Sequence, residues 1–153
     1  MYSNLETKEN LYLQCVHFVE KRFNTIQNTI NEIQESLTSE TKSSAGDKHE
    51  TGRAMLQLER EKAGNQLAEI QKIKENLSKI TSANTSKKIG LGSVVYTNKS
   101  NYFIAISAGE LKVENEVFYA ISPNTPIGQL LLGKTADDAV IFRDTKFTIT
   151  RVI

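Results

Sequence analysis

The sequence has few of the residues that mark secreted, metal-binding or membrane proteins. It contains one cysteine, Cys15, and no tryptophan among 153 residues. A single cysteine excludes a disulfide framework and an all-cysteine zinc site, and in a helical pattern it favours a small half-buried residue over a nucleophile. No run approaches the roughly 18 apolar residues of a membrane span, and the start of the chain lacks a basic stretch followed by an apolar one. We expect a cytoplasmic protein without membrane contact.

The net charge is small, and helix breakers are scarce in the first part of the chain. The net charge is +1, which excludes a strongly basic nucleic-acid coat and predicts weak or no binding to free DNA. Neither glycine nor proline occurs before Gly46, so nothing interrupts a helix there. Apolar residues in this stretch recur at alternating steps of four and three, as in a coiled-coil seam. They are Tyr12, Val16, Val19, Phe23, Ile26, Ile30, Ile33 and Leu37.

This pattern predicts one helix over about residues 5–39, roughly 50 Å long at 1.5 Å per residue, which needs a partner. A second apolar stripe over residues 48–80 supplies it: Leu56, Ala63, Leu67, Ile70, Ile73, Leu77 and Ile80. Matching lengths and a short connection favour an antiparallel hairpin, a coiled coil over residues 1–80 with its tip at 43–50, in a monomer. The alternative is an intermolecular coiled coil, which would make the protein a structural adaptor that dimerises.

A polar linker over residues 81–89 follows and predicts a domain boundary. From residue 90 the pattern changes to short strands, with a turn at 98–101 and a tight turn at Asp144-Thr145. A short helix is predicted to begin at Pro126 and to end before Gly133. Ser122 and Thr125 are both candidates for its N-cap. The predicted strands cover residues 93–97, 102–106, 116–121, 139–143 and 146–152. We expect an α+β fold, with an antiparallel sheet and one helix over residues 90–153.

The segment around the short helix reads Ile-Ser-Pro-Asn-Thr-Pro-Ile-Gly-Gln-Leu-Leu-Leu-Gly-Lys over residues 121–134. It resembles the C-terminal signature of the bacterial Gre transcript-cleavage factors, in which Ile-Ser, a Ser/Thr-Pro step and Leu-Leu-Gly-Lys recur in this order. The order of parts is similar too, because that family has an N-terminal antiparallel coiled coil and an FKBP-like C-terminal domain. The resemblance implies a transcription elongation factor that binds bacterial RNA polymerase and has no catalytic site of its own.

The resemblance also implies a role for the tip. Asp47 and Glu50 match the two acids of the family motif, which enter the secondary channel of the polymerase and help to hold a shared Mg²⁺ near the RNA 3′ end, so that the polymerase cleaves backtracked RNA. Mg²⁺ favours carboxylate oxygens and waters, and a spacing of three places both acids on one side of a helical turn. No cofactor is expected on the free protein. Candidates for contact with RNA phosphates are Lys48, His49, Arg53 and Arg60.

Two observations keep alternatives open. Asp47 with Glu50 three residues later is also a capping box, which would satisfy free backbone N–H groups at the helix start. After Glu50 the family continues with Asn-Ala-Glu-Tyr, whereas this chain has Thr-Gly-Arg-Ala over residues 51–54. The departure keeps open a second possibility, a channel-binding regulator that modulates or inhibits the polymerase without cleavage.

The C-terminal domain is expected to dock on the polymerase through Phe118, Tyr119, Pro126 or Lys134. Residues 128–135 also satisfy the phosphate-loop pattern, but their middle is Leu-Leu-Leu. A phosphate loop needs a flexible turn between a buried strand and a long helix, so nucleotide binding there is rejected. No residues have zinc-ligand spacing. Prolyl isomerisation is an analogy of fold alone, because nothing in the sequence marks an aromatic-lined pocket.

Overall fold

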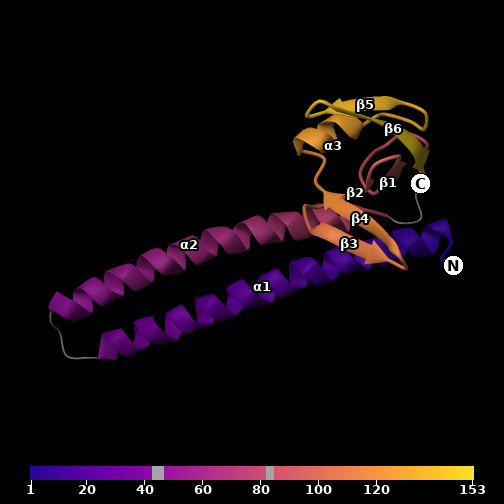
Figure 1. The fold of residues 1–153 in the computed structure, drawn as a ribbon. Helices are drawn as coiled ribbons and strands as arrows, with labels where there is room; N and C mark the ends of the chain where they lie inside the picture. Colours follow the sequence, from indigo (N-terminus) through magenta and orange to yellow (C-terminus); the bar gives the residue numbers. More distant parts are fainter. Residues whose placement is uncertain (43–46, 82–84) are drawn as a thin grey trace. The chain divides into compact units, whose positions relative to one another are not determined.

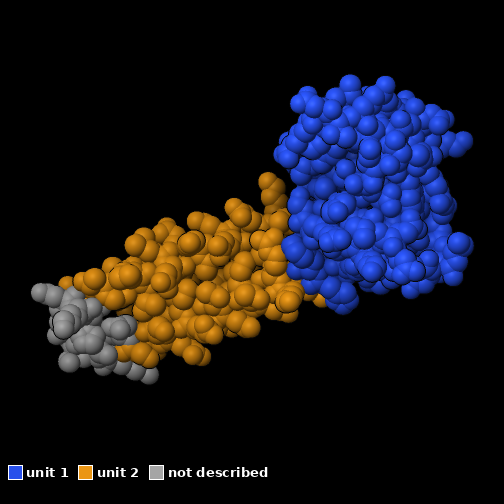
Figure 2. Space-filling view, viewed as in Figure 1, with its two compact units in different colours: residues 1–18, 75–153 blue, residues 19–74 orange. Residues whose placement is uncertain are grey.

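The computed structural model describes residues 1–42, 47–81 and 85–153, and it leaves the side chains of residues 40–42 and 47–49 undescribed. The predicted turn at 43–46 and part of the predicted linker, residues 82–84, lie outside the described residues. Contacts divide the chain into two compact units, residues 1–18 with 75–153 and residues 19–74 (Figure 2). The predicted domain limits stay a prediction.

The two predicted helices are confirmed (Figure 1). α1 (Asn4–Lys42) and α2 (Asp47–Ser78) each run without a break. Within residues 19–74 they pair antiparallel, because the Lys74 ammonium lies 5.1 Å from the centre of the Phe23 ring while Arg53 donates to the Leu37 carbonyl. A cluster of apolar side chains from both helices forms the core of this unit: Ile26, Ile30, Ile33, Leu37, Leu56, Ala63 and Leu67.

Near its start, α1 buries a different face from the predicted one. Leu11 and Cys15 are fully buried, whereas the seam residues Tyr12 and Val16 are half-buried. The expectation that Cys15 is half-buried is therefore wrong. The physical reason is that this part of α1 packs in the same unit as the sheet, so its buried face is not set by the pairing with α2 alone.

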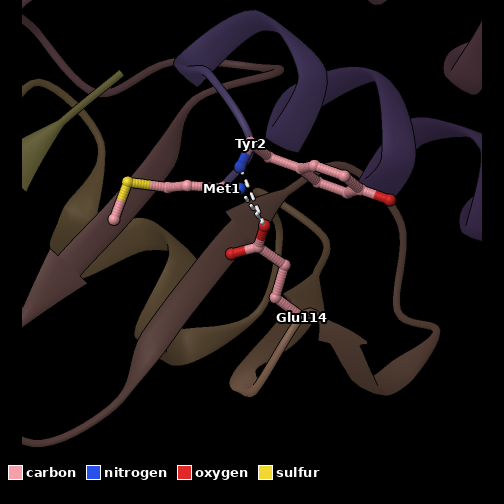
Figure 3. Close-up of polar contacts among 3 residues, drawn as sticks. All are labelled: Met1, Tyr2 and Glu114. Carbon is pink, nitrogen blue, oxygen red and sulfur yellow. Dashed lines mark hydrogen bonds and ion pairs between the residues drawn. The ribbon is translucent and has the colours of Figure 1, made fainter.

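Polar contacts hold the first turns of α1 to strand β3 (Gly109–Val113) and the turn that follows it. The Gln14 side-chain amide donates to the Lys112 carbonyl at 2.9 Å. The backbone N–H of Tyr2 donates to a carboxylate oxygen of Glu114 at 2.8 Å, and the amine of Met1 lies 3.5 Å from the same oxygen (Figure 3). The start of α1 is thus tied to the sheet at two points.

The remaining strands are β1 (Val94–Thr97), β2 (Asn101–Ile104), β4 (Glu116–Ile121), β5 (Ala139–Phe142) and β6 (Thr145–Val152). Together with β3 they form one six-stranded sheet in the order β3-β4-β2-β1-β6-β5. The expected α+β class is confirmed. The sheet is mixed and not wholly antiparallel, because β2 and β4 pair in parallel with Tyr102 opposite Tyr119. A β3–β4 hairpin follows β2, and its second strand adds to the edge of β2.

β3 itself was not expected from the sequence. It is joined to β4 by a turn at Glu114 and Asn115, in which Glu114 has φ of 56°. Glutamate rarely adopts this left-handed conformation, so the turn carries no sequence signal. The turn between β5 and β6 lies at Arg143 and Asp144, with φ of 49° and 64°, one residue before the predicted place. Two positive φ values are typical of a two-residue hairpin turn.

The short helix α3 (Pro126–Leu131) covers one face of the sheet. Thr125 is its cap, since its hydroxyl accepts from the Gly128 N–H at 3.1 Å, and Gly133 follows with φ of 80°. The apolar cluster beneath α3 consists of Ile89, Val95, Ile104, Leu131, Val140, Phe147 and Ile149. Val94, Phe103 and Phe118 alternate with residues of this face along their strands and are also fully buried. Both faces of the sheet are therefore covered by apolar packing.

Candidate functional site

The hairpin end is built by the start of α2. The helix begins at Asp47, and Glu50 lies in its first turn with an exposed side chain. Asp47, Lys48 and His49 have helical backbone, but their side chains lie outside the described residues. The start of a helix carries a partial positive charge and free N–H groups, which favours acidic side chains there. A metal-binding role and a capping role for the two acids are both compatible with this placement.

The two arginines of the predicted RNA-contacting set lie along the helices. Arg53 is half-buried, and its guanidinium donates a long hydrogen bond of 3.5 Å to the Leu37 carbonyl near the end of α1. Arg60 is half-buried as well, and one of its terminal nitrogens lies 3.1 Å from where a Cβ on Gly64 would stand. The aliphatic parts of both arginine side chains therefore lie along the helix surface, as is common for long basic side chains. A role of either residue in RNA contact stays a prediction.

The predicted docking residues of the sheet domain separate into buried and exposed ones. Phe118 is fully buried and contacts the Tyr96 ring edge to face at 5.6 Å between centres. Its side chain cannot reach a partner, so we correct this residue to a core position. Tyr119 is 40% exposed, and Pro126 and Lys134 are exposed. These three remain candidates for docking.

Aromatic rings that the sequence did not single out adjoin Tyr119. The Tyr102 ring centre lies 6.3 Å from that of Tyr119 and 6.4 Å from that of Phe147. Tyr102 and Tyr119 share a face because β2 and β4 are parallel with these two residues paired. The pairing joins strands that are not consecutive in the chain, so the sequence could not reveal that these aromatic rings lie side by side. Burial raises the pKa of the Tyr102 hydroxyl.

The glycines of the signature segment are packing and turn residues. A Cβ on Gly128 would lie 2.5 Å from the Ser122 carbonyl oxygen. Gly133 ends α3 in a left-handed conformation, and the Ile89 N–H donates to the Lys134 carbonyl at 2.9 Å. The segment is thus a capped helical turn packed on the sheet, which agrees with rejecting a phosphate loop there.

Metal-ligating and nucleophilic groups are sparse in the part of the chain that the structure describes. Within residues 1–39, 50–81 and 85–153, no three His, Cys, Asp or Glu side chains could hold a metal ion together. Burial raises the pKa of the Cys15 thiol to about 12, so this thiol is not a nucleophile near neutral pH. None of the described helices has an apolar stretch long enough to cross a bilayer.

No protein-family model and no curated protein matches the sequence. Among solved structures, the chain is similar to GreA factor homolog 1 (Gfh1) of Thermus thermophilus, with 19% identity and a TM-score of 0.34 over 86% of this chain and 94% of that one. A second structure, described as the transcription factor Gfh1, matches at the same identity and TM-score and covers 92% of its own chain. Superposition at this TM-score carries no weight for function.

Proposed function

We propose that the protein is a transcription elongation factor that binds bacterial RNA polymerase in the cytoplasm. Its hairpin tip enters the secondary channel and stimulates cleavage of backtracked RNA by the polymerase. The observation that carries this proposal is the start of α2 at Asp47, which puts Asp47 and Glu50 in one helical turn where the antiparallel pair connects. The Gre-like segment at residues 121–134, folded as a capped turn on the sheet, supports it.

The donor set at the tip fits a shared magnesium ion better than a resident one. Glu50 offers an exposed carboxylate, and Asp47 offers a second from the same turn. Mg²⁺ usually takes one or two carboxylates and keeps several waters, so two acids suffice only where a partner supplies the other ligands. When bound, the ion supplies charge stabilisation in phosphodiester hydrolysis. The protein's own part is to hold the two carboxylates in place on a preformed helical turn.

Docking is proposed for the sheet domain. Tyr119, Pro126 and Lys134 combine an aromatic ring, a rigid apolar ring and a cation, which suits the polar rim and apolar centre of a protein interface. Lys48, His49, Arg53 and Arg60 are proposed to meet the phosphates of the displaced RNA end through charge. Both contacts are made in the complex with polymerase, and binding to free DNA is weak or absent.

A stalled, backtracked elongation complex tests this proposal. We expect the wild-type protein to stimulate shortening of the RNA in Mg²⁺, and the Asp47→Ala/Glu50→Ala double variant to bind the complex equally well without stimulating cleavage. A double variant that stimulates as strongly as the wild type would remove the two acids from the mechanism.

Arg53 favours a second candidate, a regulator that occupies the channel without promoting cleavage. Where the Gre motif has a glutamate, this chain places a basic residue whose guanidinium lies against α1. We expect the Arg53→Glu/Ala54→Tyr variant, which restores the family residues, to stimulate cleavage more strongly than the wild type if the departure suppresses it. Equal cleavage by both, with channel competition retained, would show that residues 53 and 54 do not decide between the candidates.

A further inference from the structure

A cavity of about 490 Å³ lies in the unit that contains the sheet, which consists of residues 1–18 and 75–153. Three segments line it: the first turns of α1, the end of the linker and the end of β6. Its polar lining includes Asn4, Lys8, Ser86 and Lys87, and its apolar lining includes Leu5 and Val152. The volume falls within the roughly 300–1,000 Å³ of small-molecule sites, which combine apolar walls with a few polar groups.

The charged side chains of the described lining have one sign. Lys8 and Lys87 contribute cations, and no aspartate or glutamate belongs to the described lining. Lys8 is only 3% exposed, and burial lowers the pKa of its ammonium. An anion in the cavity would stabilise the charged form of this lysine. A lysine ammonium carries three donors, so Lys8 can bind an anion beside another partner.

Uncharged donors complete the polar side. The Ser86 hydroxyl accepts from the Lys88 backbone N–H at 3.2 Å, which leaves its own O–H to donate. The Asn4 carbonyl oxygen is engaged by the Arg151 guanidinium, so its amide nitrogen is the end that can donate. Two cations with hydroxyl and amide donors suit a doubly charged oxyanion.

We propose that this cavity binds a small organic phosphate, with the phosphate held by Lys8, Lys87 and Ser86 and the apolar part of the ligand against Leu5 and Val152. Such a ligand bridges α1, the linker and β6 within one unit. The site does not use the hairpin tip. A test of phosphate binding is therefore independent of a test of the proposed function.

Titration of the full ¹⁵N-labelled chain, followed by NMR, tests the site with three probes: phenyl phosphate, inorganic phosphate and phenol. Phenyl phosphate is expected to give saturable shifts centred on the amides of Leu5, Ser86 and Lys87. Inorganic phosphate is expected to bind at the same place several-fold more weakly, and phenol to give no saturable shift there. Shifts that do not saturate, or that spread over the lysines of the whole surface, would overturn the proposal.

Neighbouring lysines offer a matched pair of variants. Lys87→Gln is expected to weaken phenyl phosphate about fivefold to tenfold, the effect of one charge-assisted hydrogen bond. Lys88→Gln makes the same charge change at a residue outside the lining and is expected to change binding less than twofold. Lys8→Met tests the buried cation, with its folding checked by circular dichroism. The proposed site would be overturned if Lys87→Gln and Lys88→Gln weakened the binding of phenyl phosphate equally, or if neither variant weakened it.

Discussion

At the scale of single residues, the packing of α3 depends on Gly128. Alanine is the better helix former by about 1 kcal/mol, yet its Cβ would stand 2.5 Å from the Ser122 carbonyl and 2.8 Å from the Thr125 hydroxyl. We expect Gly128→Ala to lower the free energy of unfolding of the sheet domain by about 1–3 kcal/mol, measured by urea denaturation. Gly90→Ala is the control, because a Cβ there meets nothing within 4 Å. Equal stability of the two variants would contradict this packing.

Cys15 makes stability depend on pH above neutrality. Burial raises its pKa from 9.0 to about 12, so the unfolded chain loses this proton at lower pH than the folded one. The contribution of the protonated thiol to the free energy of unfolding is complete below about pH 9. It falls by about 1.4 kcal/mol per pH unit between the pKa of the unfolded chain and that of the folded chain. Between pH 7 and 10, the free energy of unfolding of the wild type should fall by about 1.4 kcal/mol more than that of Cys15→Ala. The comparison of the two proteins cancels the contribution of the other titrating groups. Parallel pH profiles would contradict the burial of the thiol.

At the scale of elements, the pairing of α1 with α2 rests on a few apolar side chains. Ile33 is buried between them, and truncation to alanine removes its contacts and leaves a cavity. We expect Ile33→Ala to destabilise the helix pair by about 2–4 kcal/mol, read from the urea midpoint of the helical signal at 222 nm. Gln34→Ala, at the next and exposed position, should shift the midpoint little. A comparable shift for both would mean that this seam does not hold the pair.

The elements differ in how far the sequence could predict them. The two long helices and α3 were predictable because periodicity, caps and the absence of breakers act locally. The parallel pairing of β2 with β4 was not, since it joins two strands that are separated in the chain by β3. The burial of Leu11 and Cys15 does not follow from the helix pattern for a related reason: that part of α1 packs in one unit with the sheet as well as with the end of α2.

The candidate site divides in the same way. Asp47 and Glu50 are singled out by the resemblance to the family motif, whereas their spacing shows only that they share a first helical turn and fits a capping box equally well. Phe118 and Tyr119 could not be told apart, since β4 is apolar on both faces and only the packed sheet shows that one ring is buried and the other exposed. The cavity near Lys8 and Lys87 is assembled from three distant segments, so no local pattern marks it.

At the scale of the whole molecule, we propose that two carboxylates on one helical turn help a partner enzyme to hold its metal ion. A magnesium titration of RNA cleavage in backtracked complexes tests it most directly, with the wild type compared with Asp47→Asn/Glu50→Gln, which keeps the shape of both side chains and removes their charge. We predict that the wild type lowers the Mg²⁺ concentration for half-maximal cleavage several-fold relative to this variant, with equal binding to the polymerase. The same magnesium dependence and the same rate for both proteins would mean that the two carboxylates do not help to hold the metal ion.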